Sequence, residues 1–212
     1  MSSSVERLIG VFMDVFRGKK LDGKIVLDLG CGFGVWGHLL RAINENENFY
    51  LIGCDIFKPY LQKLRYHCPY DDLVLCDARN PPFRSSSVNI VIAFEIIEHL
   101  DKYDGIKLLS NLEDLCNEQI IISTPYGFYD QSVVRNNKFE QHKSAWSKED
   151  FENAGYIVKP CGFGIDLEDL FRKYHLTNLW RKIAKSIFKV DWAGFMLVAT
   201  KKIKYKRRRK AN

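Results

Sequence analysis

The stretch VLDLGCGFGVWG, residues 26–37, decides the fold of this chain. An apolar strand that includes Asp28 runs into glycines at positions 30, 32, 34 and 37, after which the apolar residues have helical spacing. A strand that ends in a glycine-rich loop and opens a helix presents backbone N–H groups and the positive end of the helix to a ligand. Because glycine permits left-handed turns and close approach of a ligand, we predict that a nucleotide-like molecule binds over bare N–H groups here.

The glycines of this loop fit two patterns. Residues 32–37, GFGVWG, match the dinucleotide fingerprint G-x-G-x-x-G. Read one step earlier, the loop is Asp28-x-Gly30-x-Gly32-x-Gly34, with an acid at the end of the strand. The loop alone indicates generic nucleotide binding, so the rest of the chain has to decide which cofactor it holds.

Length and composition indicate one folded domain. The chain has 212 residues, of which 46% are hydrophobic and 27% charged, enough for a full core. No stretch approaches the roughly 20 apolar residues of a membrane span, and the N-terminal residues lack the pattern of a signal peptide. The six cysteines form no C-x-x-C pair, which favours buried free thiols over a zinc or disulfide framework. We therefore predict a cytoplasmic protein.

The positive charge of the chain is concentrated at one end. Residues 201–210, KKIKYKRRRK, carry eight basic residues and no acid, whereas the formal net charge of the whole chain is +6. The rest of the chain therefore sums to −2 (6 − 8). Any affinity for nucleic acid or an anionic membrane is predicted to reside in residues 201–210.

Strands and helices alternate along the chain. Beyond the opening strand, we predict strands at 48–55, 73–78, 88–95, 118–125, 156–163 and 194–202, and helices at 5–16, 35–44, 101–116 and 147–155. This alternation predicts an α/β fold with a doubly wound, mostly parallel seven-stranded sheet and an antiparallel edge strand. We expect a single domain over residues 1–203, with a helical insertion at about 165–190 and a basic tail at 204–212. Residues 126–146 are predicted to form a functional loop.

Two acids lie where parallel strands end. Asp55 lies 21 positions after Gly34, the spacing at which a strand-end acid meets the ribose of a bound nucleoside. Asp77 ends the next predicted strand and precedes the small Ala78, a pair that suits the amino edge of an adenine. Either acid alone is also compatible with a turn cap or a solvated loop.

Taken together, these segments resemble a known family. DLGCGFG, GCD, CDA and NPPFRSSSVNIVIAFEIIEHL are similar in order and spacing to the motifs of class I S-adenosylmethionine-dependent methyltransferases, especially the branch with small-molecule O-, N- and C-methylating members. The likeness covers about residues 24–160 and implies a Rossmann-like fold that binds S-adenosylmethionine. The implied cofactor-binding residues are Asp28, Gly30, Cys31, Gly32, Gly34, Asp55, Ile56, Asp77, Ala78 and Glu95. A dinucleotide cofactor, by contrast, leaves Asp28 and Asp77 without a role.

Methyl transfer needs a nucleophile held at attack distance and often a base that takes its proton. Our candidate catalytic residues are Glu95 and His99, in the segment Glu95-x-x-Glu98-His99, and His142 in the late loop. This set also resembles the metal site of small-RNA 2′-O-methyltransferases, and its Glu-x-x-Glu-His part recurs in ubiquinone-pathway O-methyltransferases. Many family members carry such a pair without metal, so we assign no metal ligand, and a structural role for His99 stays open.

The motifs and the resemblance leave three candidate functions. The leading one is an S-adenosylmethionine-dependent methyltransferase that acts on an O or N nucleophile of an unidentified small or medium-sized acceptor. The alternatives are a metal-assisted RNA 2′-O-methyltransferase and a non-catalytic S-adenosylmethionine-binding adaptor. Fold does not choose among them, because the acceptor is set by loops.

Overall fold

The computed structural model of the chain describes residues 3–127, 131, 133, 136–161 and 196–203. Its centre is a seven-stranded sheet in the order β3-β2-β1-β4-β5-β7-β6. The strands are β1 (Ile25–Leu29), β2 (Tyr50–Asp55), β3 (Asp72–Leu75), β4 (Val88–Phe94), β5 (Cys116–Pro125), β6 (Ile157–Cys161) and β7 (Met196–Lys202). Strands β3, β2, β1, β4 and β5 are mutually parallel, and β7 is antiparallel to β5 and to β6. The predicted fold class is confirmed.

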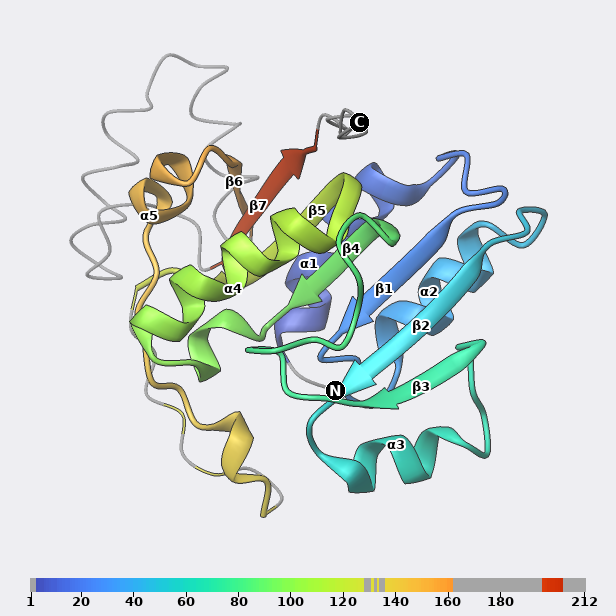
Figure 1. Ribbon diagram of the computed structural model, residues 1–212, viewed down its shortest axis with the longest axis horizontal. Coiled ribbons are helices and arrows are strands. Elements are labelled where there is room, and N and C mark those ends of the chain that lie inside the picture. Colours follow the sequence, from blue (N-terminus) through green and yellow to red (C-terminus); the bar gives the residue numbers. More distant parts are fainter. Residues whose placement is uncertain (1–2, 128–130, 132, 134–135, 162–195, 204–212) are drawn as a thin grey trace, which may run out of the picture.

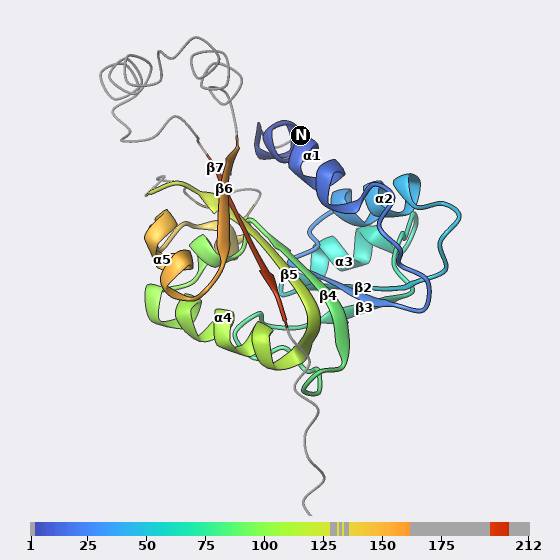
Figure 2. The same cartoon turned by 90° about the horizontal axis from the view of Figure 1, so that it is seen from above.

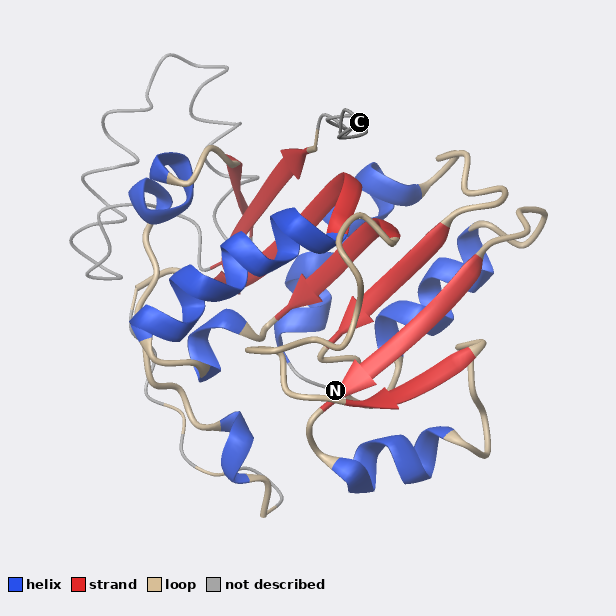
Figure 3. Cartoon of the chain, viewed as in Figure 1, coloured by secondary structure: helices blue, strands red, loops and turns tan. Residues whose placement is uncertain are grey.

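Helices cover both faces of this sheet (Figures 1 and 2). On one face lie α1 (Ser3–Phe16), α2 (Val35–Ile43) and α3 (Lys58–Leu64), and on the other lie α4 (Lys102–Leu115) and α5 (Lys148–Asn153). Two short 3-10 helices, η1 (Ile97–His99) and η2 (Lys138–Glu140), lie in the segments that follow β4 and β5 (Figure 3). The sequence did not predict α3, whose seven residues are too few to show a clear helical period.

The core has two layers because neighbouring residues of each strand point to opposite faces. Val26 belongs to the layer under α1 and α2, whereas Leu27 belongs to the layer under α4 and α5. The same alternation holds for Ile121 and Ile122 of β5. A sheet buried on both faces needs apolar residues at consecutive positions, which explains the unbroken apolar runs in the sequence.

The order of the strands places the ligand site. The chain moves from β1 outward to β2 and β3, then returns to pair β4 with the other side of β1. The carboxyl ends of β1 and β4 therefore lie at a topological switch point, where open α/β sheets bind ligands. No long helix lies between β3 and β4, as predicted, and an irregular connection runs from the carboxyl end of β3 to the amino end of β4 (Figure 1).

Three predicted details differ from the structure. The last strand, β7, pairs antiparallel with β6 as expected, but it lies between β5 and β6, so β6 is the outermost strand. β3 ends at Leu75, which leaves Asp77 in the loop beyond it. Cys68 is exposed, although the other five cysteines are buried as free thiols.

Some predictions concern the periphery of the chain. The predicted insertion at 165–190 and the tail at 204–212 lie outside the described residues. Within the described part, none of the helices has the length and apolar character needed to cross a bilayer. The cytoplasmic location and the extent of the domain stay predictions.

The end of the late loop is anchored by Trp146. This side chain is 1% exposed, and its Nε1 donates to Ser144 Oγ at 2.9 Å. Lys102 Nζ lies 3.8 Å from the centre of the indole ring and donates to the Ala145 carbonyl at 2.7 Å. Ser147 and Asp150 form a capping box at the start of α5. The loop is thus attached to both helices on this face.

Replacing Gly105 of α4 tests this anchor. A Cβ at Gly105 would lie 2.3 Å from Trp146 Cζ2, so we expect Gly105→Ala to lower the free energy of unfolding by about 1–3 kcal/mol. Gly10→Ala in α1 is the matched control, because a Cβ there meets no atom within 4 Å and alanine favours helix by about 1 kcal/mol. Urea unfolding measures both, and equal stability of the two variants would contradict the packing argument.

Candidate active site

One cavity of about 750 Å³ lies at the carboxyl ends of the parallel strands. Its wall includes Gly30 after β1, Asp55 at the end of β2, Asp77 after β3, Glu95 after β4 and Pro125 at the end of β5. Its volume is within the range of small-molecule and cofactor sites. Three of the predicted cofactor-binding acids, Asp55, Asp77 and Glu95, therefore meet at one rim, whereas the fourth, Asp28, is not among the residues that line the cavity.

Four N–H groups of the glycine loop are already bonded within the protein, so the prediction that the loop presents bare N–H groups is wrong for these four. The N–H groups of Gly30 and Cys31 both donate to the Cys54 carbonyl, at 2.7 and 2.8 Å. Gly32 N donates to Asp55 Oδ2 at 2.9 Å, and Gly34 N donates to the Cys31 carbonyl at 2.7 Å. The loop is a cradle whose shape is fixed by hydrogen bonds to the end of β2 and by one bond within the loop.

Glycine is nevertheless required in this cradle, for different reasons at different positions. Gly32 has a φ of +52°, and a Cβ there would meet no protein atom within 4 Å, so a side chain would extend into the space at the loop. Gly30 has a φ of +77°, and a Cβ would lie 1.8 Å from Ile96 Cδ1. Gly34, also left-handed, caps α2 and is not among the lining residues. Gly37 faces the ring of Tyr70.

The Asp55 carboxylate ties the cradle to β2. Its Oδ2 accepts from Gly32 N, and its Oδ1 accepts from Phe57 N at 2.7 Å. Burial raises its pKa, an effect that the hydrogen bonds from Phe57 and Gly32 oppose. The adjacent Ile56 also lines the cavity. A carboxylate oxygen accepts more than one hydrogen bond, so Asp55 can bind ribose hydroxyls while it holds the loop.

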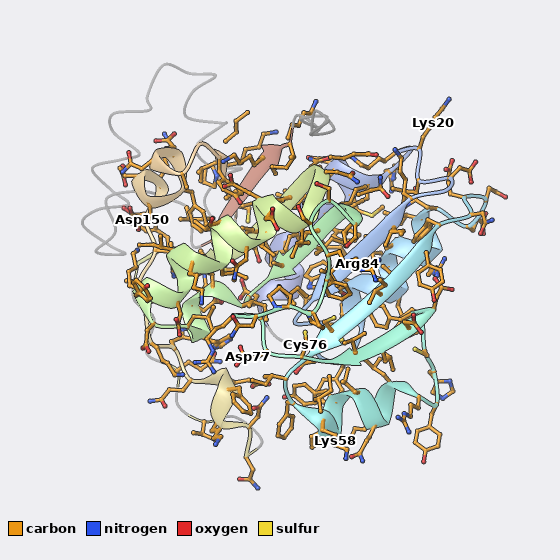
Figure 4. All side chains as sticks on the ribbon, viewed as in Figure 1. Lys20, Lys58, Cys76, Asp77, Arg84 and Asp150 are labelled. Carbon is orange, nitrogen blue, oxygen red and sulfur yellow. The ribbon has the colours of Figure 1, made fainter. Side chains whose placement is uncertain are left out.

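Asp77 is paired with Arg79. Arg79 Nη2 lies 2.6 Å from Asp77 Oδ2, and hydrogen bonds from Arg79 lower the pKa of this carboxyl. Both residues and Ala78 line the cavity. Figure 4 shows Asp77 and Cys76 beyond the end of β3, on the side of the sheet where η2 lies. The carboxylate is thus ionised at the end of the cavity where an adenine is expected.

Asp28 has a different environment from the other strand-end acids. It is 1% exposed, its Oδ2 accepts from the Tyr70 hydroxyl at 2.6 Å, and its Oδ1 has no described partner. Burial raises its pKa to about 7. Asp28 is absent from the cavity wall, so contact with a cofactor stays a prediction, and what the structure shows is a carboxyl beneath the glycine loop.

The segment after β4 places two further carboxylates. Glu95 has a φ of +56°, a conformation that is strained for a residue with a Cβ and that persists mainly at functional sites. Its Oε1 accepts from Ser123 Oγ at 3.1 Å. Glu98, at 2% exposure, accepts from Thr124 Oγ1 at 3.0 Å. Burial, followed by the charge of Glu95, raises the pKa of Glu98 well above its usual value.

Glu98, His99 and His142 come together from η1 and the late loop. One potential ligand atom from each residue lies within 4.8 Å of those of the other two, and the two imidazole rings are 5.0 Å apart. The link is made by backbone, because Lys143 N and Ser144 N both donate to the Glu98 carbonyl, at 2.8 and 3.2 Å. His99 Nδ1 lies 3.2 Å from the Gln141 carbonyl oxygen, and burial lowers the pKa of His99 to about 4. The three residues predicted to be catalytic, namely Glu95, His99 and His142, all line the same cavity.

Several cavity residues have no sequence signal. Tyr60 of α3 donates its hydroxyl to Glu140 of η2, which joins two segments 80 positions apart across the cavity. Phe33 packs on Tyr60 with ring centroids 4.3 Å apart. Met196 and Val5 also reach the wall. Only the tertiary structure brings these residues to the site, since Tyr60, Met196 and Val5 belong to no motif and Phe33 occupies an unspecified position of the glycine motif.

Comparison with known proteins identifies the class of domain. Residues 26–119 match the family model described as a methyltransferase domain. The carboxy-S-adenosyl-L-methionine synthase of Haemophilus ducreyi is 27% identical over 139 residues, which cover 62% of this chain and 55% of that protein. The chain spans only 15% to 55% of the length of the curated relatives it matches.

Solved structures share the fold. Phosphoethanolamine N-methyltransferase 2 of Haemonchus contortus, in complex with S-adenosyl-L-methionine, aligns with a TM-score of 0.59 at 15% identity, over 92% of this chain and 52% of that chain. The small RNA methyltransferase HEN1 aligns with a TM-score of 0.62 at 17% identity, over 96% of this chain and 25% of that chain. Sheet order, cavity and fold likeness define a Rossmann-like methyltransferase fold.

Residues 26–119 thus match a methyltransferase domain, and S-adenosylmethionine is the cofactor that this match and the solved structures indicate. The residues of this chain fit that cofactor, because the cavity is large enough for a nucleoside and Gly32 leaves open space at the loop. Asp55 would hold the ribose and Asp77 the adenine amino group, while Gly30, Cys31 and Gly32 would cradle the methionine part. When bound, the cofactor supplies a methyl group activated by a sulfonium.

The pKa of Asp28 predicts a pH dependence of stability. An unfolded aspartate has a pKa near 3.9, whereas Asp28 in the folded protein has a pKa of about 7. Between these values the folded state binds more protons than the unfolded state, so the free energy of unfolding falls as pH rises from about 4 to about 7 and then levels off. The loss amounts to about 4 kcal/mol.

Asp28→Asn removes this titration, so we expect the variant to lack the decline and to gain stability over the wild type as pH rises. Denaturant unfolding between pH 4.5 and 8.5, in steps of about half a unit, measures it. Asp14→Asn at an exposed position of α1 is the control and should keep the wild-type decline. An unchanged decline in Asp28→Asn would assign the effect to another group.

Proposed function

We propose that this chain transfers the methyl group of S-adenosylmethionine to an oxygen or nitrogen nucleophile of a small or medium-sized acceptor. One observation carries the proposal, namely that a single cavity contains Asp55 and Asp77 at one end and Glu95, His99 and His142 at the other. The order of the strands separates the two ends. A nucleoside over β2 and β3 leaves the space beside β4 and β5 for the acceptor.

In this proposal, the residues at the acceptor end have different roles in the transfer of the methyl group. Glu95 and His142 line the cavity and would orient the nucleophile and take its proton. His99 is a positioning residue in this proposal, because its contact with Gln141 fixes the late loop and its low pKa makes it a weak base. The late loop, anchored by Trp146, would exclude water from the transfer.

Binding of the cofactor is the first test. Because Asp55 holds both the loop and the predicted ribose position, Asp55→Ala should weaken binding of S-adenosylmethionine and S-adenosylhomocysteine at least about a hundredfold. Isothermal titration calorimetry measures this, with Asp14→Ala on the surface as the control. If the wild type binds neither compound, the proposal fails.

Mass spectrometry of a cell extract incubated with a heavy-methyl donor then identifies labelled products, and cofactor binding without any product would favour the adaptor function.

A second candidate is metal-assisted RNA 2′-O-methylation. The cluster of Glu98, His99 and His142 supports it, since one carboxylate and two imidazoles form a common donor set for transition metals. The similar fold of the small RNA methyltransferase HEN1 agrees with it. The basic residues 201–210 would add affinity for RNA, although β7 carries its end, Lys202, to the edge of the sheet opposite the cavity, where it pairs with Gln119.

Manganese titration tests the second candidate. If the cluster holds metal, Mn²⁺ should bind with a stoichiometry near one and EDTA should abolish methylation of a short RNA duplex. His142→Ala should weaken Mn²⁺ binding about 10- to 100-fold, whereas His67→Ala, an exposed surface histidine, should have no effect. Loss of salt-dependent RNA binding on deletion of 204–212 would locate the RNA contact. Methylation unaffected by EDTA would remove this candidate.

A further inference from the structure

We propose that the hydrogen bond from Tyr60 to Glu140 is a latch at the cofactor end of the cavity, and that its opening sets the rate at which the cofactor enters and leaves. The latch joins α3 to residues 140–146, a segment that we call the strap. This inference rests on the placement of S-adenosylmethionine in the cavity, as in the proposed function, and does not depend on the identity of the acceptor. Tyr60 and Glu140 are positioning residues in it, because neither is assigned a contact with the reacting atoms.

The end of the strap beside β5 is fixed by backbone hydrogen bonds. Gly127 N, two residues after β5, donates to the Trp146 carbonyl at 2.8 Å. Lys143 N and Ser144 N donate to the Glu98 carbonyl at 2.8 and 3.2 Å. The Trp146 side chain is 1% exposed and belongs to the core layer under α4. This end of the strap is therefore held by the core of the domain.

The other end of the strap is held by side chains. Tyr60 donates its hydroxyl to the Glu140 carboxylate, and Asn137 Nδ2 donates to the same carboxylate at 3.4 Å. Gln131 Nε2 donates to the Glu140 carbonyl at 2.9 Å. The bonds from Asn137 and Gln131 stay within the late loop, whereas the bond from Tyr60 comes from another wall of the cavity. Opening of this bond would release the strap from α3.

The order of the strands indicates what the latch encloses. β1 and β4 lie between β2, which leads into α3, and β5, whose end is bonded to the strap. The path from β2 through α3, the latch and the strap to β5 therefore spans the carboxyl ends of β1 and β4. Asp55, Tyr60, Glu140 and His142 on this path all line the cavity. The closed path thus bounds the space in which we place the cofactor.

Asp55, the predicted ribose contact, lies close to the latch. Burial is the main cause of the raised pKa of Asp55, and the negative charge of Glu140 adds to it, so the two carboxylates are near each other. Asp55 Oδ1 also accepts from Phe57 N, at the start of α3. A nucleoside bound to Asp55 would therefore lie beside the Tyr60 hydroxyl, and the latch would open for it to leave.

Aromatic packing holds the Tyr60 hydroxyl in position. The Tyr60 side chain is 7% exposed, and its ring centroid lies 4.3 Å from that of Phe33 and 4.9 Å from that of Phe57. A hydrogen bond to an ionised carboxylate is stronger than one between neutral groups, which favours the closed form. A side-chain contact can nevertheless open while the domain stays folded.

A latch has a kinetic signature that a direct contact with the cofactor lacks. If exchange requires the open form, a weaker latch raises the association and dissociation rate constants by the same factor, and the dissociation constant stays nearly the same. Loss of a direct contact instead raises the dissociation rate constant alone and weakens binding. Measurement of both rate constants therefore separates the two roles.

The variant Tyr60→Phe removes the hydroxyl and keeps the ring. We expect both rate constants for S-adenosylhomocysteine to rise about tenfold, with a change in the dissociation constant below about twofold. Surface plasmon resonance on the immobilised chain measures these constants. Tyr66→Phe is the matched control, because this tyrosine follows α3 and is 83% exposed, and it should keep the wild-type rate constants.

Substitutions of Glu140 test the other half of the latch. Glu140→Ala removes the acceptor and should raise both rate constants by the same factor as Tyr60→Phe. The double variant should raise them no further, because both substitutions break one bond. Glu140→Gln keeps an acceptor oxygen and should raise them about threefold or less.

The outcomes separate the latch from the proposed function. If the wild type binds neither S-adenosylmethionine nor S-adenosylhomocysteine, the proposed function fails and the latch with it. If the cofactor binds and Tyr60→Phe keeps the wild-type rate constants, the latch fails while the methyltransferase proposal stands. Faster dissociation with unchanged association in Tyr60→Phe would also overturn the latch, since the hydroxyl would then contact the cofactor directly. Independent effects of the Tyr60 and Glu140 substitutions would overturn their assignment to one bond.

Discussion

The hydrogen bonds between the glycine loop and the end of β2 are the constraint on which the site depends. One carbonyl, that of Cys54, accepts from both Gly30 and Cys31, and the next side chain, Asp55, accepts from Gly32. The loop therefore takes its shape from the neighbouring strand before any ligand arrives. The N–H groups bonded in this way precede α2, and Asp55 both shapes the loop and lines the cavity.

The cavity separates two chemical environments along the sheet. Over β2 and β3 the acids are engaged by the loop backbone or by Arg79, which suits the neutral hydroxyls and amino group of a nucleoside. Beside β4 and β5, Glu95 and Glu98 lie with two histidines under a loop that Trp146 holds against α4. In the proposed function, recognition of the cofactor and chemistry on the acceptor would therefore lie on opposite sides of the switch point.

Most of the cofactor end could be predicted because its residues are local in sequence. Asp55, Asp77 and Glu95 each follow an apolar strand, and parallel strands bring their carboxyl ends to one edge. Asp28 is the instructive exception. It lies inside β1, one residue before the strand ends, and pairs in register with Gly53 rather than with Asp55. Tyr70, for which no motif exists, binds it beneath the loop.

The sequence by itself determined the α/β class, the parallel core of the sheet and the edge at which the acids gather, because these follow from short-range periodicity and from glycine stereochemistry. Only the tertiary structure decided that the loop N–H groups are already bonded, that Tyr60 reaches Glu140 and that β7 lies inside β6. Each of these is a contact between segments far apart in the chain. The outcome of such contacts depends on packing across the whole domain, which no local pattern encodes.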